Sequence, residues 1–395
     1  MPARAEATTH RDHALTAFRA LVLSDVALQD ALGQIEDFAV FVTQAAEAAR
    51  GRGVDLDAET LRARLHAPVA DLVVPDGLPP LPGWLPAEVS RVDDRDVVTW
   101  LHFGRRRLTE PFYGDDLVKA RWRPLNRLLS FRTPLLDLEA WASALPAIEP
   151  AGLVFHMSRC GSTLVAQMLA APPRHVVLSE PAPLDAIVRL DDHDAAAKAV
   201  LLRAMVTVLG QARNPGEDRC FLKLDCWHTL SLPLFRRAFP DARWVFLYRD
   251  PVEVMVSHGR RRGAQMVPSL VAPAMFGIDL PGGVPNDDYC ARVLAAVCEG
   301  AMQHIPEGGA LMVNYPQLPE ALFTTVLPHF GLAVSRDEAD AMRCAAVRDA
   351  KAPEQAFSAD GQGKQQAASE AVRAICEVRL GEVYRRLEAL REEQA

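Results

Sequence analysis

Short apolar runs alternate with helical patterns along the C-terminal two thirds of the chain. The apolar runs predict strands at 152–157, 175–179, 220–224, 243–249 and 310–315. Between and after them, apolar residues recur at the spacing of one helix face, which predicts helices at 162–171, 193–210, 230–239, 251–261, 287–304, 317–330, 336–347 and 366–391. Short apolar strands separated by helices are typical of an α/β fold, in which helices flank a buried parallel sheet.

The N-terminal part of the chain shows helical periodicity only. Leu15, Phe18 and Leu21 recur at helical spacing, 38–49 forms a second amphipathic segment, and Asp57 is suited to cap a further helix. Prolines then cluster between 68 and 86, which indicates a linker. We therefore expect a small helical N-terminal domain over 1–70, with a boundary near 70–85.

Aromatic residues are concentrated between this linker and the first predicted strand of the α/β region. Val97–Phe103 reads as a strand and Gly104–Arg107 as a turn, and tryptophans stand at 84, 100, 122 and 141. Such a density of aromatic side chains usually marks a core or packing against a neighbour. The sequence thus predicts a mixed segment over 71–150 that packs on a catalytic domain spanning 151–395.

Composition restricts the functional classes. The chain has 395 residues and a net charge of −8, which argues against a nucleic-acid-binding protein. No apolar run approaches the roughly 20 residues that span a bilayer, and the N-terminus lacks the apolar core of a signal peptide. Seven scattered cysteines without a CxxC pair suit free thiols and no structural zinc. We expect a cytoplasmic protein with no membrane or nucleic-acid partner.

The first predicted strand of the α/β region ends in a loop suited to bind an anion. The loop, 158–163, is small and polar and precedes a helix, so backbone N–H groups and a helix N-terminus surround one point. Ser162 and Thr163 add hydroxyl donors, and Arg159 adds a planar guanidinium. The lysine of the G-x-x-x-x-G-K-[ST] loop is absent, so this loop does not rest on a Walker-type lysine and Mg²⁺.

A second strand end carries matching chemistry. The run 243–249 ends in Arg249, and Asp250 and Pro251 are suited to begin the next helix. Ser257 follows about two turns along that helix. Arg249 and Ser257 are therefore expected to reach one phosphate at the C-terminal edge of the sheet, the usual ligand site of open α/β sheets.

Together these two stretches resemble the sulfotransferase family, including its bacterial members. That family uses 3′-phosphoadenosine 5′-phosphosulfate (PAPS), and its [KR]-x-G-[ST]-[ST] loop is matched by 159–163. Its 3′-phosphate pair is matched by Arg249 and Ser257, and the resemblance covers about 150–392. It implies a P-loop-like sulfotransferase fold and metal-independent transfer of a sulfuryl group from PAPS to a hydroxyl or amine.

The resemblance also implies a set of residues that bind PAPS. Tyr315 matches the Tyr of the family's Tyr-Glu-Asp segment, although Pro316 and Gln317 replace the acidic pair. Lys364 is the nearest candidate for the late basic loop, since the Arg-Lys-Gly signature is absent. The complete predicted set is Arg159, Cys160, Gly161, Ser162, Thr163, Arg249, Ser257, Tyr315 and Lys364. Cys160 is interpreted as a small packing residue, although a helix N-terminus can lower a thiol pKa.

Four residues are candidates for catalysis. Glu180 follows the strand 175–179 and matches the base of the tyrosylprotein branch, so it is the first candidate for the general base. Lys223 resembles the family lysine that faces the sulfuryl group, although no proline follows it here. His228 is a rival base that stands further from this lysine than in cytosolic members, and Arg159 completes the set. His156 and His258 are interpreted as structural histidines.

Two other functions remain open at this level. A non-catalytic nucleotide- or phosphate-binding docking module would explain the loop, and a P-loop small-molecule kinase would require Mg²⁺ and the missing lysine. The segment from Leu23 to Asp57 also resembles a leader-like helical domain of nitrogen-fixation gene clusters, which suggests peptide recognition. The acceptor, whether a small molecule or a peptide, and the oligomeric state are not specified by the sequence.

Overall fold

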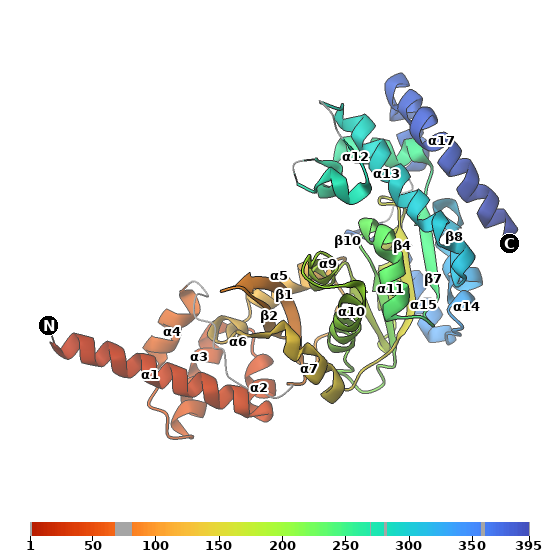
Figure 1. Ribbon diagram of the computed structural model, residues 1–395. Helices are drawn as coiled ribbons and strands as arrows, with labels where there is room; N and C mark the ends of the chain where they lie inside the picture. Colours follow the sequence, from red (N-terminus) through yellow and green to blue (C-terminus); the bar gives the residue numbers. More distant parts are fainter. Residues whose placement is uncertain (1, 68–80, 269, 280–282, 357–359, 395) are drawn as a thin grey trace.

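The computed structural model describes residues 2–67, 81–268, 270–279, 283–356 and 360–394. Most of the predicted proline-rich linker, at 68–80, lies outside the described residues. Figure 1 shows the N-terminal helices, a small sheet and a larger sheet following one another along the chain, with the C-terminal helix beside the larger sheet.

The N-terminal part is helical, as the periodicity predicts. It contains α1 (Pro2–Ser24), α2 (Val26–Gly33), α3 (Phe38–Arg50) and α4 (Ala58–His66). Asp57 caps α4 by accepting the backbone N–H of Thr60, as expected. Phe18 and Phe41 are fully buried, and Arg19 donates to the carbonyl of Leu128, 2.8 Å away. These helices therefore pack on the segment that follows them.

The aromatic-rich segment forms a three-stranded antiparallel sheet with short helices. The strands β1 (Trp84–Val92), β2 (Arg95–His102) and β3 (Phe131–Pro134) lie in sequence order, with α5 (Tyr113–Arg121), α6 (Pro124–Leu128) and α7 (Leu138–Ala144) around them. On one face Trp100 stacks on Trp141 at 4.0 Å between ring centroids, so the aromatic residues do form a core.

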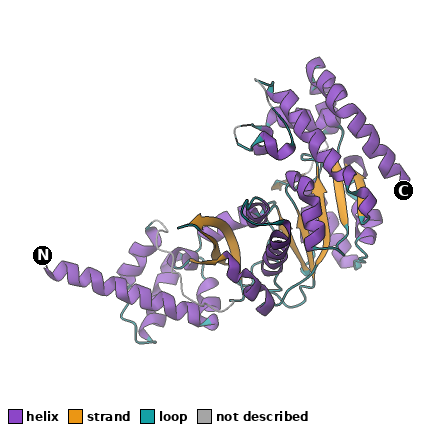
Figure 2. Cartoon of the chain, viewed as in Figure 1, coloured by secondary structure: helices purple, strands orange, loops and turns teal. Residues whose placement is uncertain are grey.

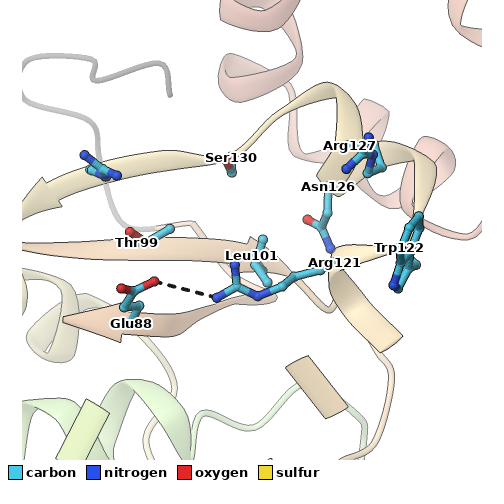
Figure 3. A pocket seen from close by; sticks show the side chains of 9 residues that line it. Glu88, Thr99, Leu101, Arg121, Trp122, Asn126, Arg127 and Ser130 are labelled. Carbon is cyan, nitrogen blue, oxygen red and sulfur yellow. Dashed lines mark ion pairs between the residues drawn. The ribbon is translucent and has the colours of Figure 1, made fainter. Parts of the chain in front are cut away.

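The opposite face of this small sheet is polar. Glu88 pairs with Thr99, and Thr99 pairs with Arg132, so the three side chains form a row across the strands. They line a cavity of about 340 Å³ together with Arg121 and Trp122 from the end of α5 (Figure 3). None of the predicted catalytic or PAPS-binding residues lies in this cavity.

The C-terminal part is the predicted parallel sheet flanked by helices (Figure 2). Its strands are β4 (Pro150–His156), β5 (His175–Ser179), β6 (Arg219–Lys223), β7 (Trp244–Tyr248) and β8 (Ala310–Asn314), in the spatial order β5-β6-β4-β7-β8. The helices are α8 (Ser162–Ala170), α9 (Ala182–Val188), α10 (Ala195–Leu209), α11 (Leu232–Ala238), α12 (Pro251–Arg260), α13 (Asn286–Gln303), α14 (Leu327–His329), α15 (Arg336–Ala346), α16 (Gly361–Ala367) and α17 (Glu370–Glu393).

This strand order determines where a ligand can bind. The central strand β4 lies between β6 and β7, and the chain leaves β4 toward β5 on one side of the sheet but leaves the neighbouring β7 toward β8 on the other. The C-terminal ends beside such a switch point form a crevice that no crossing connection covers. All residues of β5 and β7 are buried, which explains why β7 and the interior of β5 are apolar.

Three details differ from the sequence expectation. The helix expected over 317–330 is present over 320–329, but it begins after Pro319 and contains a π-helical segment, Leu322–Val326, before the short α14, because the prolines remove backbone hydrogen-bond donors. The helix α9 was not predicted. The stretch between the helices expected at 336–347 and 366–391 contributes β9 (Arg348–Asp349), β10 (Ala352–Ala356) and α16.

Candidate active site

The loop between β4 and α8 has an unusual backbone. Ser158, Arg159 and Gly161 have φ angles of 82°, 53° and 87°, in the left-handed region. A side chain at Gly161 would be strained, and its Cβ would lie 2.7 Å from the ring of Tyr315. Glycine is therefore required at this position by both the backbone angle and the approach of Tyr315.

The predicted PAPS-binding residues all line one cavity. This cavity, called the donor cavity below, measures about 210 Å³ and lies over the loop. Its described lining residues are Arg159, Cys160, Gly161, Ser162, Thr163, Leu164, Arg249, Ser257, Tyr315, Asp349, Ala350, Lys351, Asp360 and Lys364. The structure thus brings together residues that are up to two hundred positions apart in the chain.

Arg249 is the most enclosed cation of the donor cavity. Only 4% of it is exposed, and its guanidinium lies 3.9 Å above the ring centroid of Tyr315. It pairs with Glu253 at 2.6 Å and with Asp360 at 2.9 Å. Asp360 also pairs with Lys364 at 2.7 Å, so one carboxylate lies between two cations. An anionic group is therefore favoured at this position.

Cys160 occupies the loop as a packing residue. Its thiol is fully buried and donates to the carbonyl of Leu247, 3.1 Å away. Burial raises the pKa of this thiol to about 11, although backbone N–H groups of the loop oppose the shift. The lowered thiol pKa that a helix N-terminus can produce is therefore absent here.

A second cavity of about 510 Å³, called the acceptor cavity below, lies beside the first. Glu180, Lys223 and His156 come from the C-terminal ends of three neighbouring strands and meet in it. The backbone N–H of Glu180 donates to the carbonyl of Lys223 at 2.7 Å, with Glu180 at a φ of 51°. The Glu180 carboxylate forms an ion pair with the Lys223 ammonium and lies 3.3 Å from Nε2 of His156.

The charge state of Glu180 follows from these contacts. Burial alone would raise its pKa, but the Lys223 charge and the nearby His156 lower the pKa to about 2. Nδ1 of His156 accepts the backbone N–H of Ser158 at 3.1 Å, so a neutral ring carries its proton on Nε2, toward Glu180. Burial lowers the pKa of His156, which keeps the ring neutral. His156 thus has its structural hydrogen bond and also contacts the candidate base.

Lys223 is enclosed by the aromatic-rich segment. Only 1% of it is exposed, and its ammonium lies 4.7 Å from the ring centroid of Phe112. Ser179 fixes this segment by donating to the carbonyl of Pro111 at 2.7 Å. The sequence did not indicate that Phe112 covers the site, because it lies far from the strand ends in the chain.

Lys351 is a second residue that the sequence analysis missed. It lines both cavities but is exposed at their edge, and partial desolvation there, together with the charges of Arg159 and Lys223, lowers its pKa to about 8. Its position in an irregular segment between β9 and β10 gives no periodic or motif signal.

His228 lies behind the acceptor cavity wall. It is 1% exposed, and its Nε2 lies 3.0 Å from the carboxylate of Asp185. Its neighbours Asp225 and Trp227 line the cavity, whereas His228 does not. Of the two candidate bases, the geometry therefore favours Glu180.

The two cavities share a wall. Arg159, Ser162, Thr163 and Lys351 line both of them. One cavity presents an anion-binding loop and cations, and the other presents a buried carboxylate–lysine pair. This arrangement suits the transfer of an anionic group from a donor on one side of the loop to an acceptor on the other.

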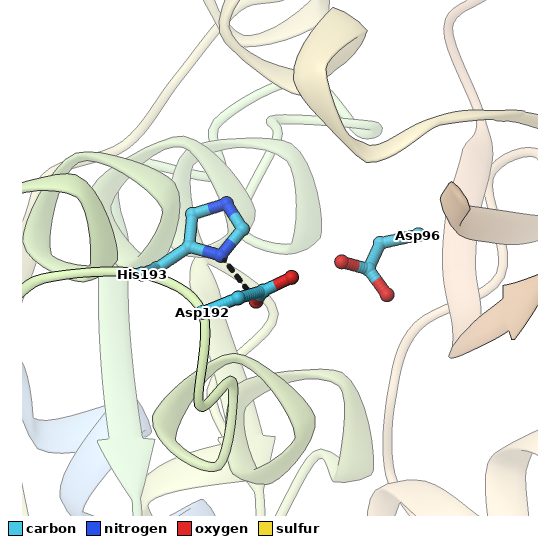
Figure 4. Close-up of side chains that lie close together, drawn as sticks. All are labelled: Asp96, Asp192 and His193. Atoms are coloured by element: carbon cyan, nitrogen blue, oxygen red, sulfur yellow. Dashed lines mark hydrogen bonds and ion pairs between the residues drawn. The ribbon is translucent and has the colours of Figure 1, made fainter. Parts of the chain in front are cut away.

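A separate polar cluster lies far from the loop in the chain. Ligand-type atoms of Asp96, Asp192 and His193 lie within 4.8 Å of one another (Figure 4). The guanidinium of Arg91 lies 3.0 Å from Asp192 and 3.9 Å from Asp96, so an arginine already supplies the positive charge.

Among the described helices, none has the length and apolar character needed to cross a membrane.

Comparisons with known proteins bear on this site. A model of the sulfotransferase family matches residues 153–336. No curated protein matches the chain. Among solved structures, sulfotransferase STF9 from Mycobacterium avium is similar at 14% identity and a TM-score of 0.40, over 62% of this chain and 81% of that chain. The sulfotransferase STF1 from Mycobacterium tuberculosis is similar at 15% identity and a TM-score of 0.37, over 65% of this chain and 85% of that one.

A third structure is the sulfotransferase domain from the curacin biosynthetic pathway. It is 14% identical, with a TM-score of 0.35, and the match covers 59% of this chain and 97% of that domain. The family model is the more informative comparison, because its matched segment runs from β4 to the start of α15 and includes the shared loop. This segment contains both the central sheet and the loop that separates the two cavities, so this part of the chain is similar to the sulfotransferase family.

Proposed function

We propose that this protein transfers the sulfuryl group of PAPS to a hydroxyl or amine group of an acceptor. The observation that carries the proposal is the pair of cavities on either side of one anion-binding loop, with a carboxylate–lysine pair in the larger cavity. A transferase for an anionic group needs this separation of donor and acceptor, with cations between them.

The donor cavity supplies the contacts that PAPS requires. The loop residues, with Arg159, are assigned to the 5′-phosphosulfate, and Arg249 with Ser257 to the 3′-phosphate. Tyr315 is assigned to the neighbourhood of the adenine, and Lys364 to the phosphates. The carboxylate of Asp360 between Arg249 and Lys364 supports this assignment, because it shows where a negative group is stabilised.

The acceptor cavity supplies the proton acceptor. Glu180 removes the proton of the acceptor group, the acceptor oxygen or nitrogen forms a bond to sulfur, and the bond between sulfur and the 5′-phosphate oxygen breaks. The leaving phosphate keeps the electron pair. Arg159, Lys223 and Lys351 lie where they can stabilise the charge on the transferred and leaving groups, so the mechanism relies on side-chain cations.

The ion pair between Glu180 and Lys223 couples donor binding to base strength. In the unliganded protein the Lys223 charge holds the pKa of Glu180 at about 2, which makes the carboxylate a weak base. When the Lys223 ammonium turns toward a bound sulfuryl group, the electrostatic attraction between Lys223 and Glu180 weakens, and the pKa of Glu180 rises. The base therefore gains strength only when the donor is in place.

The working compartment is part of the proposal. All seven cysteines are free, and six of them are buried, which suits a reducing cytoplasm. The acceptor is a small molecule or a peptide presented to the larger cavity.

A thermal-shift titration with adenosine 3′,5′-bisphosphate in the absence of Mg²⁺ tests the donor assignment. A ligand that binds only the folded protein raises its apparent stability by about 2.7 kcal/mol at 100 times the dissociation constant. We expect this shift in the wild type and its loss in Arg249→Ala. A shift that requires ATP and Mg²⁺ would support a kinase instead, and no shift with any nucleotide would support a docking module.

A further inference from the structure

Asp225 is a buried acidic residue that the proposed reaction does not use. It lies two residues after the end of β6, is 8% exposed and lines the acceptor cavity. Among the described residues, none donates a hydrogen bond to its carboxylate, and the closest basic side-chain nitrogen is Nδ1 of His228 at 4.0 Å. By contrast, Glu180 in the same cavity is engaged by Lys223 and His156.

The Asp225 carboxylate destabilises the folded protein as long as it has no hydrogen-bond partner. A largely buried carboxylate that receives no hydrogen bond from the protein must find its partner in the cavity that it faces. Burial and the charges of Glu180 and Asp185 raise the pKa of Asp225 to about 7, although His228 and Lys223 oppose the shift. A destabilising polar group in a functional cavity is expected when a ligand supplies its missing partner.

The walls of the acceptor cavity indicate what kind of ligand this is. Its described lining contains no Leu, Ile, Val or Met side chain. Two aromatic rings, Phe112 and Trp227, are the large apolar surfaces, and most other lining residues are charged or polar. Sites for apolar ligands are lined mainly by hydrophobic side chains, so this cavity is poorly suited to an isolated phenol or a lipid.

We propose that Asp225 accepts a hydrogen bond from a second hydroxyl group of the acceptor, and that the acceptor is a carbohydrate-like polyol. This inference rests on the proposed sulfuryl transfer. The reacting hydroxyl gives its proton to Glu180. The neighbouring hydroxyl keeps its proton and donates a hydrogen bond to the carboxylate of Asp225. The aromatic rings can pack against the C–H face of such a molecule. Asp225 therefore orients the acceptor and selects it, and takes no part in bond making.

The pH dependence of selection follows from the charges around Asp225. Below about pH 7 the carboxyl is protonated, and above it the carboxylate is the stronger hydrogen-bond acceptor. Preference for polyols therefore increases as the pH rises through 7. The groups that face Asp225 or share its cavity are Glu180, Lys223, Asp185, His228, Asp115, His156, Arg159, Cys226, Arg261, Arg262 and Lys351.

The first experiment compares acceptors that differ in their second hydroxyl. Wild-type protein and PAPS are incubated with myo-inositol, methyl glucopyranoside, cyclohexanol or 2-naphthol, and the adenosine 3′,5′-bisphosphate formed is measured. We expect transfer to at least one polyol at a higher kcat/KM than to cyclohexanol. Transfer only to cyclohexanol or 2-naphthol, or to none of the four while adenosine 3′,5′-bisphosphate still binds, would overturn the inference but leave the donor site intact.

The second experiment tests the residue. Asp225→Ala should lower kcat/KM for the polyol by about ten- to hundredfold more than for cyclohexanol, the usual effect of losing a hydrogen bond to a charged group. Asp115→Asn removes an exposed carboxylate of the same cavity and should leave the polyol-to-cyclohexanol ratio unchanged. An equal loss for both acceptors in Asp225→Ala would contradict selection by Asp225.

A third measurement, of thermal stability, tests the unpaired state of Asp225 without relying on activity. Asp225→Asn removes the buried charge without changing the shape of the side chain. Because the native pKa of Asp225 is above its value in the unfolded chain, the carboxylate destabilises the wild type increasingly as the pH rises from about 4 to 7. The variant should therefore melt at a higher temperature than the wild type at pH 8, with a smaller difference at pH 5. A lower melting temperature at pH 8 would contradict the unpaired state of this carboxylate.

Discussion

The donor and acceptor cavities share a loop but are built in different ways. The donor cavity is formed largely by motif residues that follow strands, and two of its cations, Arg249 and Lys364, are paired with the carboxylates of Glu253 and Asp360. The acceptor cavity combines strand ends with Phe112 from the N-terminal segment and Lys351 from a late irregular segment. Donor recognition is thus encoded by local motifs, whereas acceptor recognition depends on parts of the chain that meet only in the folded protein.

The two cavities also differ in how their charges are satisfied. In the donor cavity, Arg249 and Lys364 are held by carboxylates that an incoming phosphate can replace. In the acceptor cavity, Glu180 is paired with Lys223, and Asp225 has no hydrogen-bond donor among the described residues. The first cavity is therefore poised for an anion, and the second for a hydrogen-bond donor. The experiments below test whether the two cavities act independently.

The largest expected effect is on the acceptor side. Glu180→Gln should lower kcat by about 10²- to 10⁴-fold, because a general base contributes that much to a proton transfer. Binding of adenosine 3′,5′-bisphosphate, measured by calorimetry, should stay within about twofold of the wild type, since Glu180 does not line the donor cavity. A parallel loss of nucleotide affinity would show that the two cavities do not act separately.

The next effect is on the donor side. Gly161→Ala places a side chain against Tyr315 at a φ of 87°, which should destabilise the fold by about 1–3 kcal/mol and weaken binding of adenosine 3′,5′-bisphosphate at least tenfold. Gly216→Ala is the matched control, because Gly216 has a φ of 85° but no atom within 4 Å of its added Cβ. This control should lose stability without losing affinity. Wild-type affinity of Gly161→Ala for adenosine 3′,5′-bisphosphate would show that the loop does not contact the bound nucleotide.

A smaller effect is expected from Asp360. Asp360→Asn removes the carboxylate that competes with a phosphate for Arg249 and Lys364, so adenosine 3′,5′-bisphosphate should bind about two- to fivefold more tightly, as the loss of a half-exposed ion pair suggests. Asp218→Asn, on the surface beside Arg174, serves as the control. Weaker binding in Asp360→Asn would mean that Asp360 supports the donor site.

The smallest effect concerns Cys160. Because burial raises its pKa to about 11, this thiol should not react with a disulfide reagent at pH 8 in the folded protein. Cys344 is exposed and should be the single fast-reacting thiol, and Cys344→Ser should remove the fast phase. Fast modification that adenosine 3′,5′-bisphosphate blocks would instead place a reactive Cys160 inside the donor site.

The sequence was most informative at the ends of strands, where local structure also places the candidate site residues. The strand ends at 156, 179, 223 and 248 were predictable to within about one residue because buried parallel strands have apolar interiors and stop near polar residues. The helix expected over 317–330 forms over 320–329, but its start after Pro319 and its π-helical segment were missed because the apolar spacing was recognised without weighing Pro319 and Pro328. Similarly, His228 was a candidate by its distance in sequence from Lys223, and the turn after β6 directs Asp225 and Trp227 into the cavity instead.

By itself, the sequence determined the parallel α/β fold, the anion-binding loop and the residues around it, because each belongs to a strand end and its following helix, and parallel strands share one C-terminal edge. The tertiary structure alone decided that Phe112 covers Lys223, that Lys351 joins the two cavities, that Asp360 bridges Arg249 and Lys364, and that Asp225 is buried without a donor. These contacts join segments far apart in the chain, or depend on which residues a short turn buries, so no periodicity or motif in one segment specifies them.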